Sequence, residues 1–166
     1  MIILGIDPGY AIVGYGVIEK SSSGTRMIDY GVITTHKDER MCDRLVKIAE
    51  ALEIIIDKYK PDCLALEELF FKNNQKTAIN VAMARGVLLY IADKKIGSDY
   101  MYEYTPLQIK QALTGNGRAE KAQVQYMVKA ILNLKSIPKP DDAADALAVA
   151  LCHSQTNLTL SGTKIK

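Results

Sequence analysis

The first 35 residues alternate between short apolar runs and turn residues. Residues 2–6 form an apolar run that is typical of a buried strand, and residues 11–19 and 27–35 have the Val, Ile and Tyr content of strands. A Ser-rich loop that ends at Gly24 separates the second run from the third. The pattern predicts an antiparallel, three-stranded meander.

Helical spacing follows the meander. From Met41 to Tyr59, apolar residues recur three or four positions apart, and Pro61 stands just beyond this stretch. Thr105-Pro-Leu-Gln108 has the form of a capping box with proline at the first helical position, and the helix it starts stops at Gly115. The other predicted elements are strands over residues 63–67 and 99–104 and helices over residues 77–95, 119–134 and 141–154.

This order of elements predicts an α/β fold in one domain over residues 1–155, with a mixed sheet and helices on both faces. Residues 156–166 are polar, and we expect a frayed tail there. Of the 166 residues, 48% are hydrophobic and 24% are charged, as in an ordinary globular protein, and no apolar stretch is long enough to cross a membrane.

The three cysteines are Cys42, Cys63 and Cys152, which are far apart and odd in number. We expect buried, reduced thiols and a cytoplasmic protein.

The net charge of +2 is unevenly distributed. Between Thr105 and Lys139 the chain has six basic residues and one acidic residue, so this segment carries +5 and the remainder about −3. Such asymmetry can indicate a polyanionic partner, or only a solvated helix face.

Four acidic residues stand at the ends of predicted elements: Asp7 and Glu67 end strands, and Asp142 and Asp145 begin the last helix. Taken singly, each has an ordinary explanation, since Asp-Pro-Gly forms turns and acids stabilise a helix start. Asp142 and Asp145 share one helical face, however, and the two strands are plausible neighbours in this topology. Four converging carboxylates need cations, and oxygen ligands without clustered His or Cys suit Mg²⁺ or Mn²⁺.

With these residues assembled, the chain resembles the RuvC family of bacterial Holliday-junction resolvases, within the ribonuclease H-like superfamily. The similarity runs in order from residue 2 to about residue 153. The segments that carry it are Ile3-Leu-Gly-Ile-Asp-Pro-Gly9, Gly14-Tyr-Gly-Val17, Ala65-Leu-Glu67, Ala84-Arg-Gly86, Gln108-Ile-Lys-Gln111, Ala119-Glu-Lys-Ala-Gln123 and Asp142-Ala-Ala-Asp-Ala-Leu-Ala148.

The resemblance implies a five-stranded ribonuclease H-like sheet and a homodimer that nicks two strands of a four-way DNA junction symmetrically. It implies catalytic and metal-binding roles for Asp7, Glu67, Asp142 and Asp145, with Asp7 bridging two Mg²⁺ ions per subunit, for which Mn²⁺ can substitute. The products would carry a 5′ phosphate and a 3′ hydroxyl. The branch-migration complex RuvA-RuvB is the protein partner that the resemblance implies.

The resemblance also implies DNA contacts. Lys110 and Lys121 match basic residues near the scissile phosphate or the DNA backbone, and Phe70 matches an aromatic residue that lies against junction bases. We add Arg118 from the same basic segment as a further candidate for DNA binding. Phe71 stands next to Phe70, so either ring could make the base contact.

Dimerisation has support from the residues themselves. The predicted helix over residues 77–95 carries apolar side chains around most of its circumference, more than one sheet face can cover. A two-fold partner could cover the rest, as could another helix of the same chain.

Three alternative functions stay open at the level of sequence. The first is a nuclease of the same fold with another nucleic-acid substrate, of the RuvX type. The second is an ATP-binding domain of the actin and sugar-kinase kind, although 166 residues are too few for its usual two domains. The third is a junction-binding module without catalysis, which nothing in the sequence supports, because all four acids are present.

Overall fold

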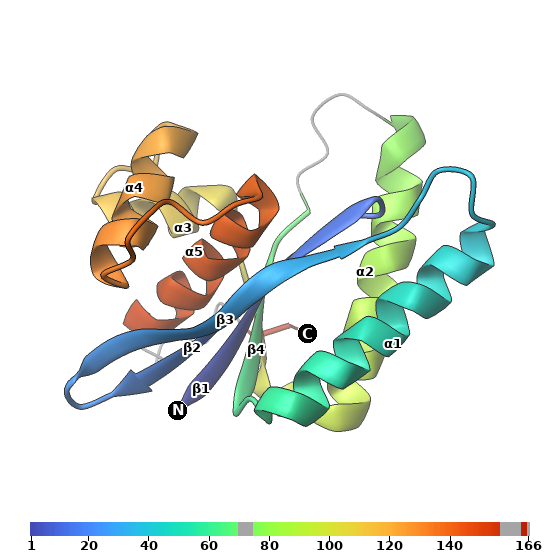
Figure 1. Ribbon diagram of the computed structural model, residues 1–166, viewed down its shortest axis with the longest axis horizontal. Helices are drawn as coiled ribbons and strands as arrows, with labels where there is room; N and C mark the ends of the chain where they lie inside the picture. The colour runs from blue at the N-terminus through green and yellow to red at the C-terminus, as the bar shows by residue number, and fades with distance from the viewer. Residues whose placement is uncertain (70–74, 157–163, 166) are drawn as a thin grey trace.

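The computed structural model describes residues 1–69, 75–156 and 164–165, and these form a five-stranded mixed sheet between two layers of helices (Figure 1). The strand order is β3-β2-β1-β4-β5. The strands are β1 (Ile2–Asp7), β2 (Ile12–Ser21), β3 (Gly24–Thr34), β4 (Cys63–Glu67) and β5 (Met101–Tyr104). The first three form the predicted antiparallel meander, and β4 and β5 run parallel to β1.

Helices cover both faces of the sheet, as the sequence predicts (Figure 1). One layer contains α1 (Met41–Tyr59) and α2 (Gln75–Lys95), and the other contains α3 (Pro106–Thr114), α4 (Lys121–Ile131) and α5 (Asp141–Gln155). In the second layer, α5 lies directly against β1 and β2, while α3 and α4 pack against α5. Among the described residues, no helix combines the length and apolarity needed to cross a membrane.

Each face of the sheet has its own hydrophobic core, because side chains alternate along a strand. In β1, Leu4 and Ile6 pack toward α1 and α2, whereas Ile3 packs toward α5. In β4, Leu64 and Leu66 join the first core, and Ala65 joins the second. Odd-numbered positions of both strands therefore face α5.

The contact between α5 and the sheet is very close, because glycine and alanine line it. A Cβ added to Gly5 would lie 2.2 Å from the carbonyl oxygen of Ala146, and one added to Gly14 would lie 2.0 Å from the carbonyl oxygen of Asp142. Any side chain at these positions would push the helix off the sheet. The glycines of β1 and β2 thus set how close the first turns of α5 lie to the strand ends.

Several boundaries differ from the sequence prediction. Helix α2 starts at Gln75, two residues earlier than expected, and residues 98–100 form a 3₁₀ turn, so β5 begins only at Met101. The predicted helix over residues 119–134 is shorter, because Glu120 caps its start and Asn133, with a φ of 50°, ends it.

Two further expectations need correction. Cys42 is exposed rather than buried, whereas Cys63 and Cys152 are buried as expected. Within the tail, the described residues Lys164 and Ile165 are not frayed. Lys164 pairs with Tyr102 in an antiparallel bridge, and the amide of Ile165 donates to the carbonyl oxygen of Met101.

Candidate active site

Asp7 and Glu67 occupy the carboxyl ends of the two adjacent parallel strands β1 and β4. The register pairs Ile6 with Leu66, so the two acids that follow stand side by side. Both are odd-numbered positions and therefore face α5 rather than α1 and α2. This is the juxtaposition that the sequence pattern predicts, and such strand ends are where open α/β sheets place their sites.

The first turns of α5 bring Asp142 and Asp145 to the same place. They lie three residues apart on one face of the helix. Asp7 pairs with Gly14 across β1 and β2, and Gly14 lies directly beneath the backbone of Asp142. The helix therefore carries its two carboxylates over the ends of the strands that hold Asp7 and Glu67.

Burial and neighbouring acidic charges act together on the carboxylates of Asp7, Glu67 and Asp145. Burial, together with the negative charges of Glu67, Asp145 and Asp142, raises the pKa of Asp7 to about 8. Burial and the charge of Asp145 raise the pKa of Glu67 to about 7. Burial also raises the pKa of Asp145, although the ammonium group of Lys121 opposes this shift. The site thus concentrates negative charge that the fold itself does not fully neutralise.

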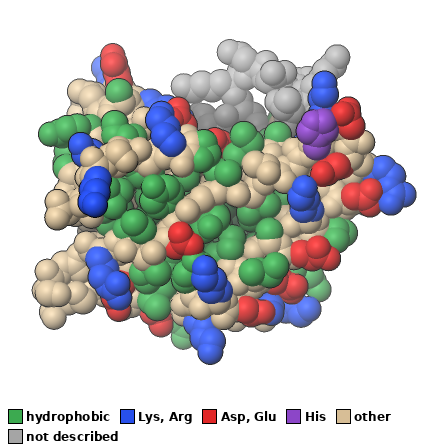
Figure 2. Space-filling model, viewed as in Figure 1, with side chains coloured by type: hydrophobic (Ala, Val, Ile, Leu, Met, Phe, Trp, Pro, Cys, Tyr) green, Lys and Arg blue, Asp and Glu red, His purple; other side chains and the backbone are tan. Residues whose placement is uncertain are grey.

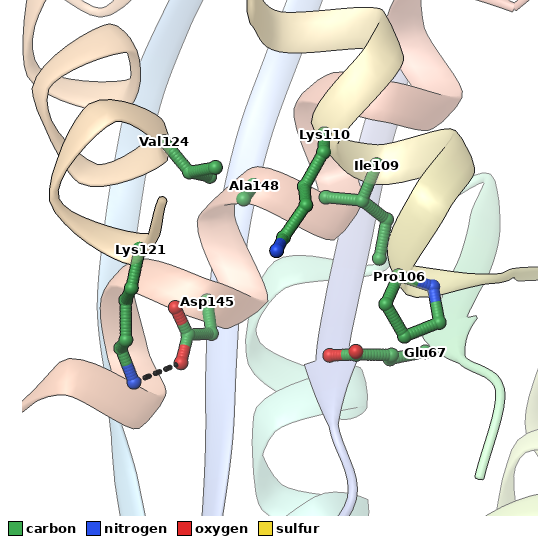
Figure 3. A pocket seen from close by; sticks show the side chains of 8 residues that line it. All are labelled: Glu67, Pro106, Ile109, Lys110, Lys121, Val124, Asp145 and Ala148. Carbon is green, nitrogen blue, oxygen red and sulfur yellow. Dashed lines mark hydrogen bonds and ion pairs between the residues drawn. The ribbon is translucent and has the colours of Figure 1, made fainter. Parts of the chain in front are cut away.

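A cavity of about 230 Å³ opens beside these acids (Figure 3). Glu67 and Asp145 project into it from β4 and α5, and Lys110 and Lys121 project into it from α3 and α4. Its apolar wall consists of Pro106, Ile109, Val124 and Ala148. Two carboxylates and two ammonium groups therefore share one small opening.

Among the described residues that line this cavity, Lys121 forms an ion pair with Asp145. Its Nζ donates to Oδ2 of Asp145 at 2.7 Å and lies 3.7 Å from Oδ2 of Asp141. Although partial burial disfavours its charged form, the hydrogen bond with Asp145 raises the pKa of Lys121. The lysine is the nearest counter-charge available to the acidic cluster.

The donor set fits hard divalent cations. It consists of carboxylate oxygens, which Mg²⁺ and Mn²⁺ prefer. Burial and the neighbouring acidic charges raise the pKa of Asp7, and bound cations would offset that cost. In the described part of the chain, no three Asp, Glu, His or Cys side chains are arranged so that they could bind one metal ion together.

Not every candidate residue joins this group. Arg118 lies in the turn between α3 and α4, where its amide donates to Oδ1 of Asn116, and it does not line the cavity. Phe70 and Phe71 lie outside the described residues.

Sequence reasoning did not single out the apolar wall or the pairing of Lys121 with Asp145. The capping box at Thr105 predicts the start of α3 at Pro106. The sequence gives no signal for the packing of α3 and α4 against α5.

Comparison with known proteins identifies the class. Residues 3–153 match the family model described as crossover junction endodeoxyribonuclease RuvC. A relative of that name from Ruminiclostridium cellulolyticum is 55% identical over 157 residues, which cover 95% of this chain and 93% of the relative. The structure of Thermus thermophilus RuvC superposes with a TM-score of 0.88 at 34% identity and covers 99% of both chains.

A second structure, Thermus thermophilus RuvC in complex with a Holliday junction substrate, superposes with a TM-score of 0.89 at 35% identity, covering 99% of this chain and 98% of that one. The chain described here belongs to the RuvC family of crossover junction endodeoxyribonucleases. Its fold is the ribonuclease H-like fold that the resemblance implied.

Proposed function

We propose that this protein is a structure-specific endonuclease that resolves four-way DNA junctions by paired symmetric nicks. The observation that carries this proposal is the meeting of Asp7, Glu67, Asp142 and Asp145 at the edge of the sheet, in a chain of this family. The junction bound by the Thermus thermophilus protein supports the choice of substrate.

In this proposal, Asp7, Glu67, Asp142 and Asp145 hold two Mg²⁺ ions per subunit, with Mn²⁺ as a substitute. When bound, the ions would supply a nucleophilic water and would neutralise charge that develops on the phosphate. The protein's part is to keep the four carboxylates on two strand ends and one helix, so that little reorganisation is needed when the phosphate arrives. The expected products have a 5′ phosphate and a 3′ hydroxyl.

The basic residues take up the DNA backbone. Lys110 and Lys121 project into the cavity beside Glu67 and Asp145, where a scissile phosphate would lie within reach of both ammonium groups. Arg118 is exposed in the α3–α4 turn and is suited to a phosphate farther along the same strand. The aromatic contact with junction bases is assigned to Phe70 on sequence grounds.

The second subunit of the proposed homodimer is expected on α2. Ala84, Leu88, Ile91 and Ala92 of this helix are buried against the rest of the chain. Its opposite side exposes Ile79, Ala82, Gly86 and Tyr90 at helical spacing, and exposed Asp93 continues this series toward the end of the helix. Ile79 and Tyr90 are 66% and 65% exposed, and no atom within 4 Å would obstruct a Cβ at Gly86.

The small residues Ala82 and Gly86 lie between two large apolar ones and let a second helix approach closely. This face of α2 is therefore suited to pack against α2 of a second subunit related by two-fold symmetry. Gly86→Arg should place a charge at its centre and shift the mass measured by light scattering from dimer to monomer. Ile54→Arg is the control, because Ile54 is 67% exposed on α1, where acidic and basic side chains surround hydrophobic ones (Figure 2). A dimeric Gly86→Arg variant would contradict the interface.

The remaining expectations concern domain limits and partners. We take residues 1–155 as the nuclease domain, because α5 ends at Gln155 and completes the layer over the sheet. The RuvA-RuvB branch-migration complex is carried over as a partner from the family resemblance alone.

The direct test of the acidic cluster is Asp7→Asn on a synthetic mobile junction. Because carboxylates hold the ions while cation–phosphate contacts supply most of the affinity, the variant should bind the junction and fail to cut it. Asp43→Asn is the matched control, since Asp43 is exposed at the start of α1 and pairs with Arg40. Normal cutting by Asp7→Asn would remove Asp7 from the mechanism.

A further inference from the structure

The connection between β1 and β2 starts immediately after Asp7 and is unusually constrained. Only residues 8–11 join the strands, and a Cβ added to Gly9 would lie 1.9 Å from the carbonyl oxygen of Ile12. The turn therefore depends on glycine at this position. A shift of this turn would move the end of β1, where Asp7 stands.

Two residues outside the turn hold its backbone. The Thr35 hydroxyl donates to the carbonyl oxygen of Tyr10 at 2.7 Å, and the Thr35 amide donates to the carbonyl oxygen of Ala11 at 2.9 Å. Arg44, in the first turn of α1, donates from Nη2 to the same Tyr10 carbonyl at 3.3 Å and from Nε to the Thr35 hydroxyl at 2.9 Å. The Tyr10 carbonyl thus accepts two hydrogen bonds.

The guanidinium group of Arg44 also lies over the Tyr10 ring, 3.6 Å from its centroid. Arg44 is only 8% exposed, and no carboxylate pairs with it among the residues that the structure describes. A buried cation without an ionic partner is costly, and here a ring, a carbonyl and a hydroxyl take the place of the carboxylate. Arg44 lies on the buried face of α1, one turn before Ile48, at a position where the helical pattern predicts a hydrophobic residue.

We propose that Arg44 is a positioning residue for the metal site: it fixes the turn that follows Asp7 and thereby the direction of the Asp7 carboxylate. This inference rests on the proposed function, because it assigns Asp7 to the ions. Some residues orient a metal-binding side chain without touching the metal ion. Removing such a residue typically changes the metal affinity by 10–100-fold. Arg44 acts through the backbone, so the lower end of that range applies.

The test compares Arg44→Gln and Arg44→Lys with the control Arg40→Gln. Arg40 lies four residues earlier, is exposed and pairs with Asp43, so its removal leaves the turn untouched. Mn²⁺ affinity of the metal-free protein is measured by calorimetry, and the Mg²⁺ concentration for half-maximal cutting is measured on a junction. Thermal unfolding of each variant is recorded in EDTA.

Arg44→Gln should weaken Mn²⁺ binding roughly tenfold and raise the half-saturating Mg²⁺ by the same factor, with cutting restored at saturating metal. The Mn²⁺ affinity of Arg44→Lys should lie between those of the wild type and Arg44→Gln. Lysine keeps the charge over Tyr10 but cannot donate to two partners in the fork geometry of arginine. If Arg44→Gln fails to fold, Thr35→Val removes the shared hydroxyl and should weaken Mn²⁺ binding in the same direction.

Unchanged Mn²⁺ affinity in a folded Arg44→Gln variant, even with a lower melting temperature, would overturn the proposal and leave Arg44 a merely structural residue. Failure of the proposed function has a different signature, because the wild-type protein itself would then bind no Mn²⁺ at the acidic cluster.

Discussion

The crowded carboxylates should make the metal-free protein less stable than a variant that lacks one of them. Burial and three neighbouring acids raise the pKa of Asp7 from 3.8 to about 8. A carboxyl group whose folded-state pKa is raised destabilises the fold above its unfolded pKa, and the penalty grows until the pH passes the folded pKa. Asp7→Asn keeps the shape of the side chain and removes the ionisable group, and with it this penalty.

The expected gain follows from the two pKa values. At pH 7 the difference between 3.8 and about 8 corresponds to about 4 kcal/mol, and at pH 5 to about 2 kcal/mol. Asp7→Asn should therefore stabilise the metal-free protein by about 2–4 kcal/mol at pH 7 and by less at pH 5. Most substitutions at partly buried positions destabilise instead, so the sign alone is informative.

Urea unfolding in EDTA at pH 5 and pH 7 measures this gain. Asp43→Asn is the control and should change stability by less than about 0.5 kcal/mol at either pH, because its carboxylate is exposed. Addition of Mg²⁺ should stabilise the wild-type protein and have little effect on Asp7→Asn. A variant that is no more stable than the wild type in EDTA at pH 7 would refute the electrostatic reasoning.

Three further predictions concern single side chains. Lys121→Ala should weaken junction binding and flatten its salt dependence by about 0.9 in the slope of log K against log salt, whereas an unchanged slope would make Lys121 only a partner of Asp145. Phe70→Ala should slow cutting of an intact junction more than cutting of one with unpaired bases at its crossover, and an equal defect on both would argue for a structural role. Because burial lowers the pKa of His153 to about 4, the fold favours the neutral ring, and protonation below about pH 6.5 costs stability. Between pH 7 and pH 5, the free energy of unfolding of Asp7→Asn, measured with urea, should change unfavourably by about 2 kcal/mol relative to that of Asp7→Asn/His153→Phe.

Periodicity was enough to predict most of the fold. Local patterns predict the meander, the bounds of α1 and β4, and the capping box at Thr105. Apolar residues recur about every 3.6 positions in a helix with one buried face and every second position in such a strand. The neighbouring positions of Asp7 and Glu67 followed in turn, since parallel strands end at the same edge of a sheet.

What the sequence could not predict depends on contacts between distant segments. Arg44 can lie on the buried side of α1 because it donates hydrogen bonds to Tyr10 and Thr35 there. Both of these residues are outside the helix, so its own sequence gives no sign of them. The pairing of Lys121 with Asp145 requires α4 to pack beside α5. The early end of α4 had a local signal, because asparagine adopts a left-handed conformation readily and Asn133 does so.

Mapping of the nicks shows whether the acidic cluster cuts DNA at four-way junctions. Purified protein and Mg²⁺ are incubated with a synthetic mobile junction and with a duplex of the same sequence, and the cut positions are read on all four strands. We expect nicks at symmetric positions on two strands of like polarity in the junction, with 5′ phosphate and 3′ hydroxyl ends, and an intact duplex. An uncut junction, or equal cutting of junction and duplex, would contradict this expectation.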